Sequence, residues 1–213
     1  MVRQKKKSKI KTIIIEHVNC NLKEYIIALI VFIVGIVLGM ALLHNLSENQ
    51  KTEISGYIYS TIDSLKGNTE IDTMSLLKSS IMNNIFLSII MWFVGSTIIG
   101  LPIVYGIVAF KGFSLGYTIS AIIAILGTGN GMIFTITTML LQNIIFIPCI
   151  LALAVSATRL CKSILKDRRK ENIKYGIIKH TLFSGIICIL LVVSSFVEVY
   201  ISTTLFNCSL GMF

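Results

Sequence analysis

The sequence contains a run of 80 residues, from Ser79 to Thr158, in which Lys111 is the single charged side chain. A water-soluble domain carries charge on roughly a quarter of its residues. In this chain only 14% of the residues are charged and 54% are hydrophobic, with a mean hydropathy of +0.84. These values exclude a soluble enzyme, a disordered tail and a disulfide-rich secreted module. They predict an all-α integral membrane protein, a polytopic helical bundle with little chain left for a soluble domain.

The apolar runs set the number of membrane crossings. A helix needs about 20 apolar residues to cross the hydrocarbon core of a bilayer, so residues 25–206 are expected to form about five transmembrane helices. The expected spans are 25–43, 81–103, 104–126, 132–158 and 181–206. The remaining segments are a basic N-terminus at 1–24, a polar loop at 44–80, a basic loop at 159–180 and a short tail at 207–213.

The positive charge is concentrated in two blocks, which indicate the orientation. Of 19 Lys and Arg, seven lie in residues 1–24 and eight in residues 159–180. Cytoplasmic segments of membrane proteins are enriched in Lys and Arg, so both blocks are predicted to be cytoplasmic, with the N-terminus inside and the C-terminus outside. The net charge of +9 then reflects topology and attraction to anionic membrane lipids. No nucleic-acid partner is expected.

Two connections between spans can be placed from glycine and proline. The turn between the second and third spans lies either at Lys111-Gly112 or at Gly100-Leu101-Pro102. The second position would put Lys111 inside the bilayer. The glycine-rich segment Gly127-Thr128-Gly129-Asn130-Gly131 is expected to form an outer loop before the fourth span.

The polar loop at 44–80 has helical character over Ile54–Leu65. Its apolar residues recur at helical spacing, at Ile54, Ile58, Ile62 and Leu65. This stripe predicts a short helix that covers the bundle. The alternatives are a helix lying on the outer membrane surface and one that docks a partner.

Four polar residues within the expected spans are candidate functional or packing positions, because polar groups are costly at membrane depth. Glu198 is a candidate proton or cation site or partner contact, although it is also close enough to the outer interface to reach headgroups or loop lysines. Lys111 is either buried and functional, or lies at a turn or snorkels to the interface. Gln142 and Asn143 are expected to hydrogen-bond across helices rather than to bind a substrate.

Two GxxxG motifs predict close helix packing, because glycine lets helix backbones approach. Gly35 and Gly39 form one in the first span, and Gly112 and Gly116 form the other. Packing within the bundle is favoured over dimerisation, and a homo-oligomer is the alternative.

The sequence has no motif for catalysis, metal binding or a cofactor, and none is expected. It has no paired carboxylates, HExxH motif or Ser–His–acid set. Its five cysteines have no CxxC spacing and are expected to be free thiols or small hydrophobic residues.

The chain resembles the stage II sporulation protein M family. The resemblance lies in the basic N-terminus, the five-span plan and an ordered set of short motifs. These motifs are Asn83-Asn84-Ile85-Phe86, Lys111-Gly112-Phe113-Ser114-Leu115-Gly116-Tyr117-Thr118, and Leu141-Gln142-Asn143 followed by Pro148. The resemblance implies a role in engulfment during endospore formation, in the mother-cell engulfing or septal membrane. It also implies a non-enzymatic scaffold that holds two peptidoglycan-degrading proteins, stage II sporulation proteins D and P, at the membrane.

A second hypothesis is a transporter or an ABC-type permease subunit. Under this hypothesis Lys111, Glu198, Gln142 and Asn143 would line a polar site near the bilayer midplane, among helices interrupted by glycine and proline.

Overall fold

A computed structural model describes residues 21–66, 73–97, 99–136, 141–166 and 170–210. Within these ranges the chain forms α2 (Leu22–His44), α3 (Glu48–Lys66), α4 (Thr73–Gly95), α5 (Gly100–Leu126), α6 (Thr128–Thr135), α7 (Leu141–Lys166) and α8 (Lys170–Leu210). Five of these helices, α2, α4, α5, α7 and α8, are long and apolar enough to cross a membrane. The predicted all-helical bundle with five spans is therefore confirmed, whereas its orientation stays a prediction.

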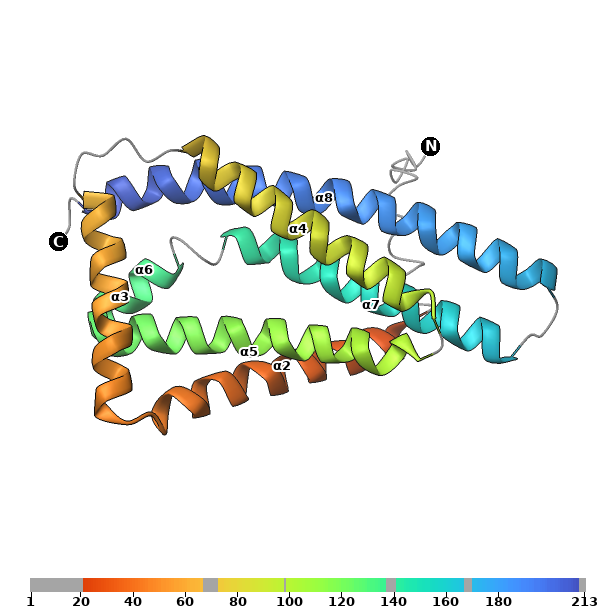
Figure 1. Cartoon of the computed structure of the whole chain (residues 1–213), viewed down its shortest axis with the longest axis horizontal. Helices are drawn as coiled ribbons and strands as arrows, with labels where there is room; N and C mark the ends of the chain where they lie inside the picture. The colour runs from red at the N-terminus through yellow and green to blue at the C-terminus, as the bar shows by residue number, and fades with distance from the viewer. Residues whose placement is uncertain (1–20, 67–72, 98, 137–140, 167–169, 211–213) are drawn as a thin grey trace, which may run out of the picture.

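Helix α7 is the buried centre of the bundle. Its most apolar stretch is 72% buried, compared with 28–33% for the other four candidate spans. Two helix pairs flank it. Helix α2 packs along α5, and α4 packs along α8 (Figure 1). Side chains from all five helices meet in one apolar core, among them Phe32, Met91, Val108, Ile150 and Leu191. The large apolar side chains on the outer faces of the flanking helices are exposed in the way expected of lipid-facing residues.

The boundary expected between spans at 103 and 104 is wrong. Helix α4 ends at Gly95, and α5 runs unbroken from Gly100 to Leu126. Pro102 lies in the first turn of α5, where its missing N–H group breaks no intrahelical hydrogen bond. Gly112 does not form a turn: it lies inside the helix, where it packs against α2. Lys111 is therefore within a membrane-spanning helix, as in the second of the two placements considered.

The expected outer loop and fourth span also differ from the structure. Helix α5 ends at Leu126, and the next residue, Gly127, has a φ of +81°, which suits glycine and few other residues. The rest of the glycine-rich segment belongs to the short helix α6, so the expected loop shrinks to this one residue. The expected span at 132–158 is replaced by α7, which begins at Leu141 and contains Pro148.

The basic segment at 159–180 is largely helical rather than a loop. Helix α7 continues to Lys166, and α8 begins at Lys170. Helix α8 is 41 residues long, which exceeds the roughly 20 residues needed to cross the hydrocarbon. The last span is therefore one part of a longer helix, and its expected limits at 181 and 206 are not helix ends.

Helix α3 confirms the helix expected in the polar loop, although it is longer than Ile54–Leu65. It lies across one end of the bundle (Figure 1). Of the apolar stripe, Ile54 has a described side chain, whereas those of Ile58, Ile62 and Leu65 lie outside the described part of the chain.

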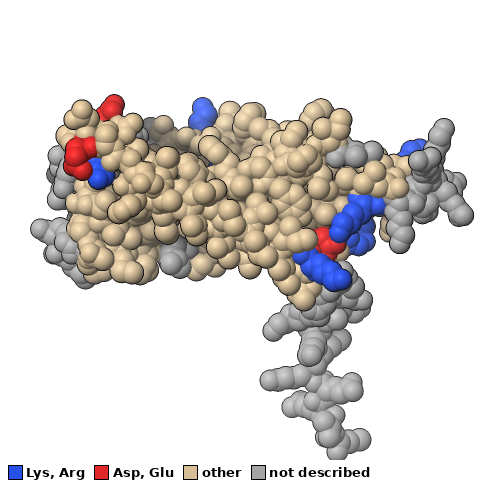
Figure 2. All heavy atoms as spheres, turned by 90° about the horizontal axis from the view of Figure 1, so that it is seen from below, with Lys and Arg blue, Asp and Glu red and all other residues tan. Residues whose placement is uncertain are grey.

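The charged side chains gather toward the two ends of the molecule. On the face drawn in Figure 2, acidic residues predominate at one end, where a basic side chain lies beside them, and basic residues predominate at the other end, with an acidic side chain among them. The long surface between the two ends is almost free of charge, as a surface in contact with lipid must be. The basic N-terminus at 1–20 and the residues after 210 lie outside the described part.

Candidate functional site

The two predicted GxxxG motifs pack against each other, and they account for the close approach of α2 and α5. A Cβ atom added to Gly39 would lie 2.8 Å from the backbone nitrogen of Tyr117. One added to Gly116 would lie 2.9 Å from the Cα atom of Ile36. Gly35 and Gly112 are equally close to the facing backbone, of Phe113 and Phe32 respectively. The four glycines therefore form an internal helix contact, as the sequence predicted.

A row of polar contacts joins α4 to α8. Ser80 donates a hydrogen bond to the Glu198 carboxylate. One turn further along α4, the Asn84 amide donates to the Ser195 hydroxyl at 2.8 Å. At the other end of α4, the Trp92 indole N–H donates to the Thr181 hydroxyl at 3.1 Å. This row, which we call the α4–α8 seam, fixes the register of two antiparallel helices.

The central residues of the α4–α8 seam are deeply buried. Asn84 is 5% exposed and Ser195 is fully buried. An amide in hydrocarbon without a partner would cost several kcal/mol, so Asn84 and Ser195 each stabilise the other in this position. The seam thus explains how polar residues are accommodated between two membrane-spanning helices.

Polar contacts also attach α7 to its neighbours. The Ser156 hydroxyl lies 2.8 Å from Nδ1 of His180 on α8. The hydroxyls of Tyr105 on α5 and Thr158 on α7 are 3.1 Å apart. His180 is 3% exposed, so it lies inside the bundle. These contacts are all on the half of α7 that leads to the basic segment.

Lys111 is half-buried on α5 and directed toward the bundle. Its Nζ atom lies 5.5 Å from the centre of the Phe146 ring on α7. It is also close enough to Glu198 for the two charges to interact. The structure therefore brings Lys111 and Glu198 into one neighbourhood, although they are 87 positions apart in the sequence.

The two amides expected to join helices are only partly described. Asn143 is half-buried near the start of α7 and is engaged in an interaction. The side chain of Gln142 lies outside the described part of the chain. Pro148 is exposed on α7.

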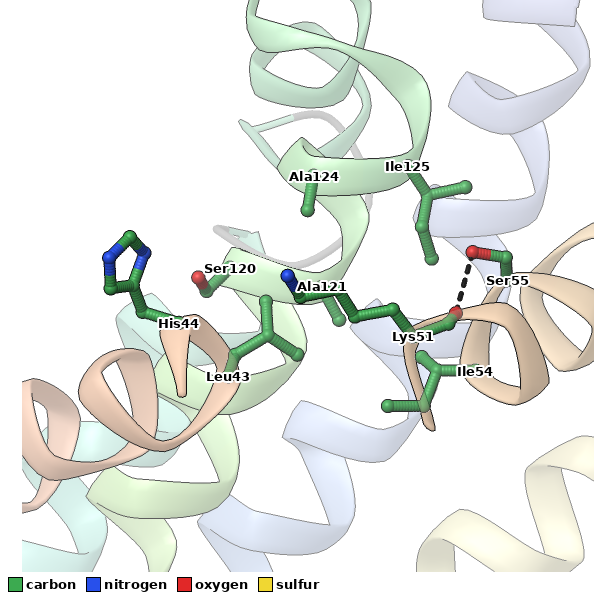
Figure 3. A pocket seen from close by; sticks show the side chains of 9 residues that line it. All are labelled: Leu43, His44, Lys51, Ile54, Ser55, Ser120, Ala121, Ala124 and Ile125. Carbon is green, nitrogen blue, oxygen red and sulfur yellow. Dashed lines mark hydrogen bonds between the residues drawn. The ribbon is translucent and has the colours of Figure 1, made fainter. Parts of the chain in front are cut away.

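A pocket of about 350 Å³ lies at the end of the bundle where α3 crosses it. Figure 3 shows its walls, which come from the end of α2, the start of α3 and the end of α5. Leu43, Ile54 and Ile125 contribute apolar side chains to these walls, whereas Lys51 and Ser120 add polar groups. Lys51 pairs with Glu48 at 3.0 Å. This pocket lies on the other helix pair from the α4–α8 seam, and it includes Ile54 of the apolar stripe but none of the four polar candidates.

At the opposite end of the bundle, an ion pair joins two spanning helices. Lys162 Nζ lies 2.7 Å from the Glu24 carboxylate, which connects the end of α7 to the start of α2. Among the residues that the structure describes, no three His, Cys, Asp or Glu side chains are close enough together to hold a metal ion.

Comparison with protein families matches residues 28–203 to the model of stage II sporulation protein M. This range takes in most of the chain and parts of all five spanning helices. The chain belongs to the stage II sporulation protein M family. No curated protein and no solved structure matches it.

The family match makes this chain a sporulation-related, multi-pass membrane protein. Two of the three motifs contribute residues to packed helix surfaces. Asn84, from the first motif, is the central residue of the α4–α8 seam, and Gly112 and Gly116, from the second, contact α2. Residues from these two motifs therefore take part in helix contacts, whereas Pro148 of the third motif is exposed.

Sequence reasoning missed most of the α4–α8 seam. It selected Glu198 but passed over Ser195, and it quoted Asn84 without giving it a structural role. A signal was present, because Ser80, Asn84 and Ser88 recur at intervals of four residues and so lie on one face of α4. Single serines are common in membrane helices, and a pattern of this kind becomes informative when its partner helix is known.

Proposed function

We propose that this protein is a non-enzymatic membrane scaffold of the engulfment machinery. In this proposal it holds two peptidoglycan-degrading proteins, stage II sporulation proteins D and P, at the mother-cell septal membrane. The observation that carries the proposal is the family match over residues 28–203. The hydrolytic chemistry would belong to the partners, and this chain would contribute a rigid platform.

The structure supports such a platform in two ways. First, α7 is enclosed by helix pairs that are held by the glycine contacts and by the α4–α8 seam, so the bundle has a defined shape. Second, α3 lies across the end of the bundle and carries exposed polar residues, including Glu48, Gln50 and Glu53. A helix with a polar outer face, next to the membrane, is well placed to bind an extracytoplasmic protein.

The test replaces residues 48–66 with a Gly-Ser linker of equal length, so that α2 and α4 stay connected. Tagged protein is then recovered from sporulating cells in mild detergent, and proteins D and P are measured by immunoblotting. We expect the wild-type protein to recover both and the linker variant to lose at least one. A thermal unfolding curve of the purified variant checks that the bundle itself is intact.

The possible results separate two claims. If the wild-type protein recovers neither D nor P, the scaffold proposal is wrong. If the wild-type and linker proteins recover both equally, the scaffold stands but α3 is not its docking element.

A second candidate function is transport, and the neighbourhood of Lys111 and Glu198 is the observation that favours it. Opposite charges and a hydrogen-bonded serine inside a helical bundle are typical of ion or proton sites in transporters. Replacing Glu198 with Gln separates the two functions. A transporter should lose its activity in sporulation while the recovery of D and P is unchanged. If the protein is a scaffold, Glu198→Gln should change its activity in sporulation little. Recovery of a nucleotide-binding ATPase with the wild-type protein, without D or P, would instead favour a permease subunit.

A further inference from the structure

The pocket beneath α3 lies at the level where a bilayer changes from hydrocarbon to headgroups. Helices α2 and α5 are candidate membrane spans, and they end at His44 and Leu126, next to the pocket. The pocket volume of about 350 Å³ falls in the range of small-molecule sites, which is about 300–1,000 Å³. An occupant at this level has to match polar groups on one side and apolar groups on the other.

Three hydrogen-bond donors, one from each of three helices, face this pocket. Figure 3 shows the Lys51 ammonium of α3 directed toward the side of the pocket where Ser120 of α5 and His44 of α2 lie. The remaining polar side chain in the wall, Ser55, already donates a hydrogen bond to the Lys51 carbonyl oxygen at 2.8 Å. An ammonium group donates three hydrogen bonds and accepts none, and a hydroxyl and an imidazole each donate one. This set of donors favours a ligand with several acceptor oxygens, and a phosphate group is such a ligand.

A negative charge lies beside these donors, outside the pocket wall. The Glu48 carboxylate is 3.0 Å from Lys51 Nζ and its side chain is 89% exposed, whereas Lys51 lines the pocket and Glu48 does not. Acidic side chains also predominate at this end of the molecule (Figure 2). A phosphate alone would be attracted by Lys51 and repelled by Glu48. A phosphate followed by an ammonium group matches both charges.

The apolar wall of the pocket continues into the lipid-facing surface of α2. Met40 and Val37 lie one and two turns before His44 on the same face of this helix, and both are exposed. A soluble phosphate ester would leave this surface uncovered. A phospholipid with its phosphate in the pocket would place its acyl chains along it. The apolar surface therefore favours a lipid over a soluble ligand.

We propose that this pocket binds the headgroup of one zwitterionic phospholipid that carries a primary ammonium group, with phosphatidylethanolamine as the test case. The phosphate accepts hydrogen bonds from Lys51, Ser120 and His44, and the ammonium group lies beside Glu48. A lipid in this position contacts α2, α3 and α5 together and holds α3 against the end of the bundle. The site goes beyond the scaffold function, because it involves neither protein D nor protein P.

The first test measures lipid binding to the purified protein in detergent by native mass spectrometry. Lys51→Gln should lower the affinity for phosphatidylethanolamine about tenfold, as the loss of one charged hydrogen bond does. Lys162→Gln is the matched control, because Lys162 also pairs with a glutamate but lies at the opposite end of the bundle. It should leave binding unchanged. Equal binding by the wild-type protein and a folded Lys51→Gln variant would overturn the proposal.

The second test concerns the headgroup. The wild-type protein should bind phosphatidylethanolamine about tenfold more tightly than phosphatidylglycerol, which has the phosphate without the ammonium group. Glu48→Gln should abolish or reverse this preference, because it removes the partner of the ammonium group. The proposal is wrong if the wild-type protein binds the two lipids equally or if Glu48→Gln keeps the preference. It is also wrong if soluble phosphoethanolamine binds as tightly as the lipid.

The third test locates the lipid on the wild-type protein, so it remains decisive if a variant does not fold. Photoactivatable phosphatidylethanolamine is reacted with the protein, and the adducts are mapped by mass spectrometry. Adducts within residues 37–55 and 120–125 support the proposal, whereas adducts confined to other helices overturn it. Since proteins D and P take no part in these measurements, failure of the lipid site leaves the scaffold proposal standing, and failure of the scaffold leaves the lipid site standing.

Discussion

Gly39 of α2 lies directly against the backbone of Tyr117 on α5, because a Cβ atom on this glycine would be 2.8 Å from the Tyr117 nitrogen. The obstacle is a backbone atom within a helix, so it has little freedom to move aside. Gly35, one turn earlier, has the same relation to Phe113, with the corresponding atoms 3.0 Å apart. The contact between α2 and α5 thus depends on the absence of side chains at these positions.

We therefore expect Gly39→Leu to lower the free energy of unfolding by about 1–3 kcal/mol or more, as overpacking of a tight contact does. The measurement is thermal or denaturant unfolding of the purified protein in detergent. Gly106→Leu on α5 is the matched control, since the space around Gly106 is open. Equal stability of the two variants would mean that α2 and α5 do not pack through their glycines.

The hydrogen bond between Asn84 and Ser195 should appear as a coupling energy in a double-mutant cycle. Interhelical hydrogen bonds in membranes have couplings of about 0.6 kcal/mol on average and up to about 1.7 kcal/mol. Because Asn84 and Ser195 are both buried, we expect a value toward the upper end from Asn84→Ala, Ser195→Ala and the double variant. Asn83, its exposed neighbour on α4, is the control and should show no coupling to Ser195. A zero coupling for Asn84 would contradict the seam.

The ion pair between Glu24 and Lys162 should contribute modestly to stability. Lys162 is largely exposed, with 60% of its side chain accessible, and exposed pairs contribute about 0.2–1 kcal/mol. Glu24→Gln should cost an amount in this range, and the cost should shrink as salt is added. The exchanged pair Glu24→Lys with Lys162→Glu should restore most of it. A salt-independent loss, or no rescue by the exchange, would show that the two charges do not interact.

Lys111 should be shielded from water, because it lies inside α5 rather than at a turn. In a variant without the five native cysteines, a cysteine at position 111 should not react with a membrane-impermeant maleimide in intact cells or inverted vesicles. Cysteines at positions 51 and 162, at opposite ends of the bundle, should each react from one side. With the predicted orientation, position 51 reacts in intact cells and position 162 in inverted vesicles. Rapid labelling at position 111 would move the turn back to Lys111-Gly112.

Properties that depend on a short stretch of chain could be predicted from the sequence. The length of the apolar runs sets the number of spanning helices, because each crossing needs a fixed number of apolar residues. The stripe beginning at Ile54 indicated α3, and the two GxxxG motifs indicated close packing. Each of these features depends on local composition or spacing.

The tertiary structure decided which residues meet and at what depth. Gly112 is compatible with a turn and with a helix contact, since a missing side chain favours both, and only the presence of α2 makes it a contact. Asn84 and Ser195 are separated by 111 positions, so their pairing depends on how α4 and α8 align. Lys111 comes near Glu198 because of how α5 and α8 are placed in the bundle. A sequence specifies the faces of its helices through local periodicity, whereas the partner of each face follows from packing all the helices together.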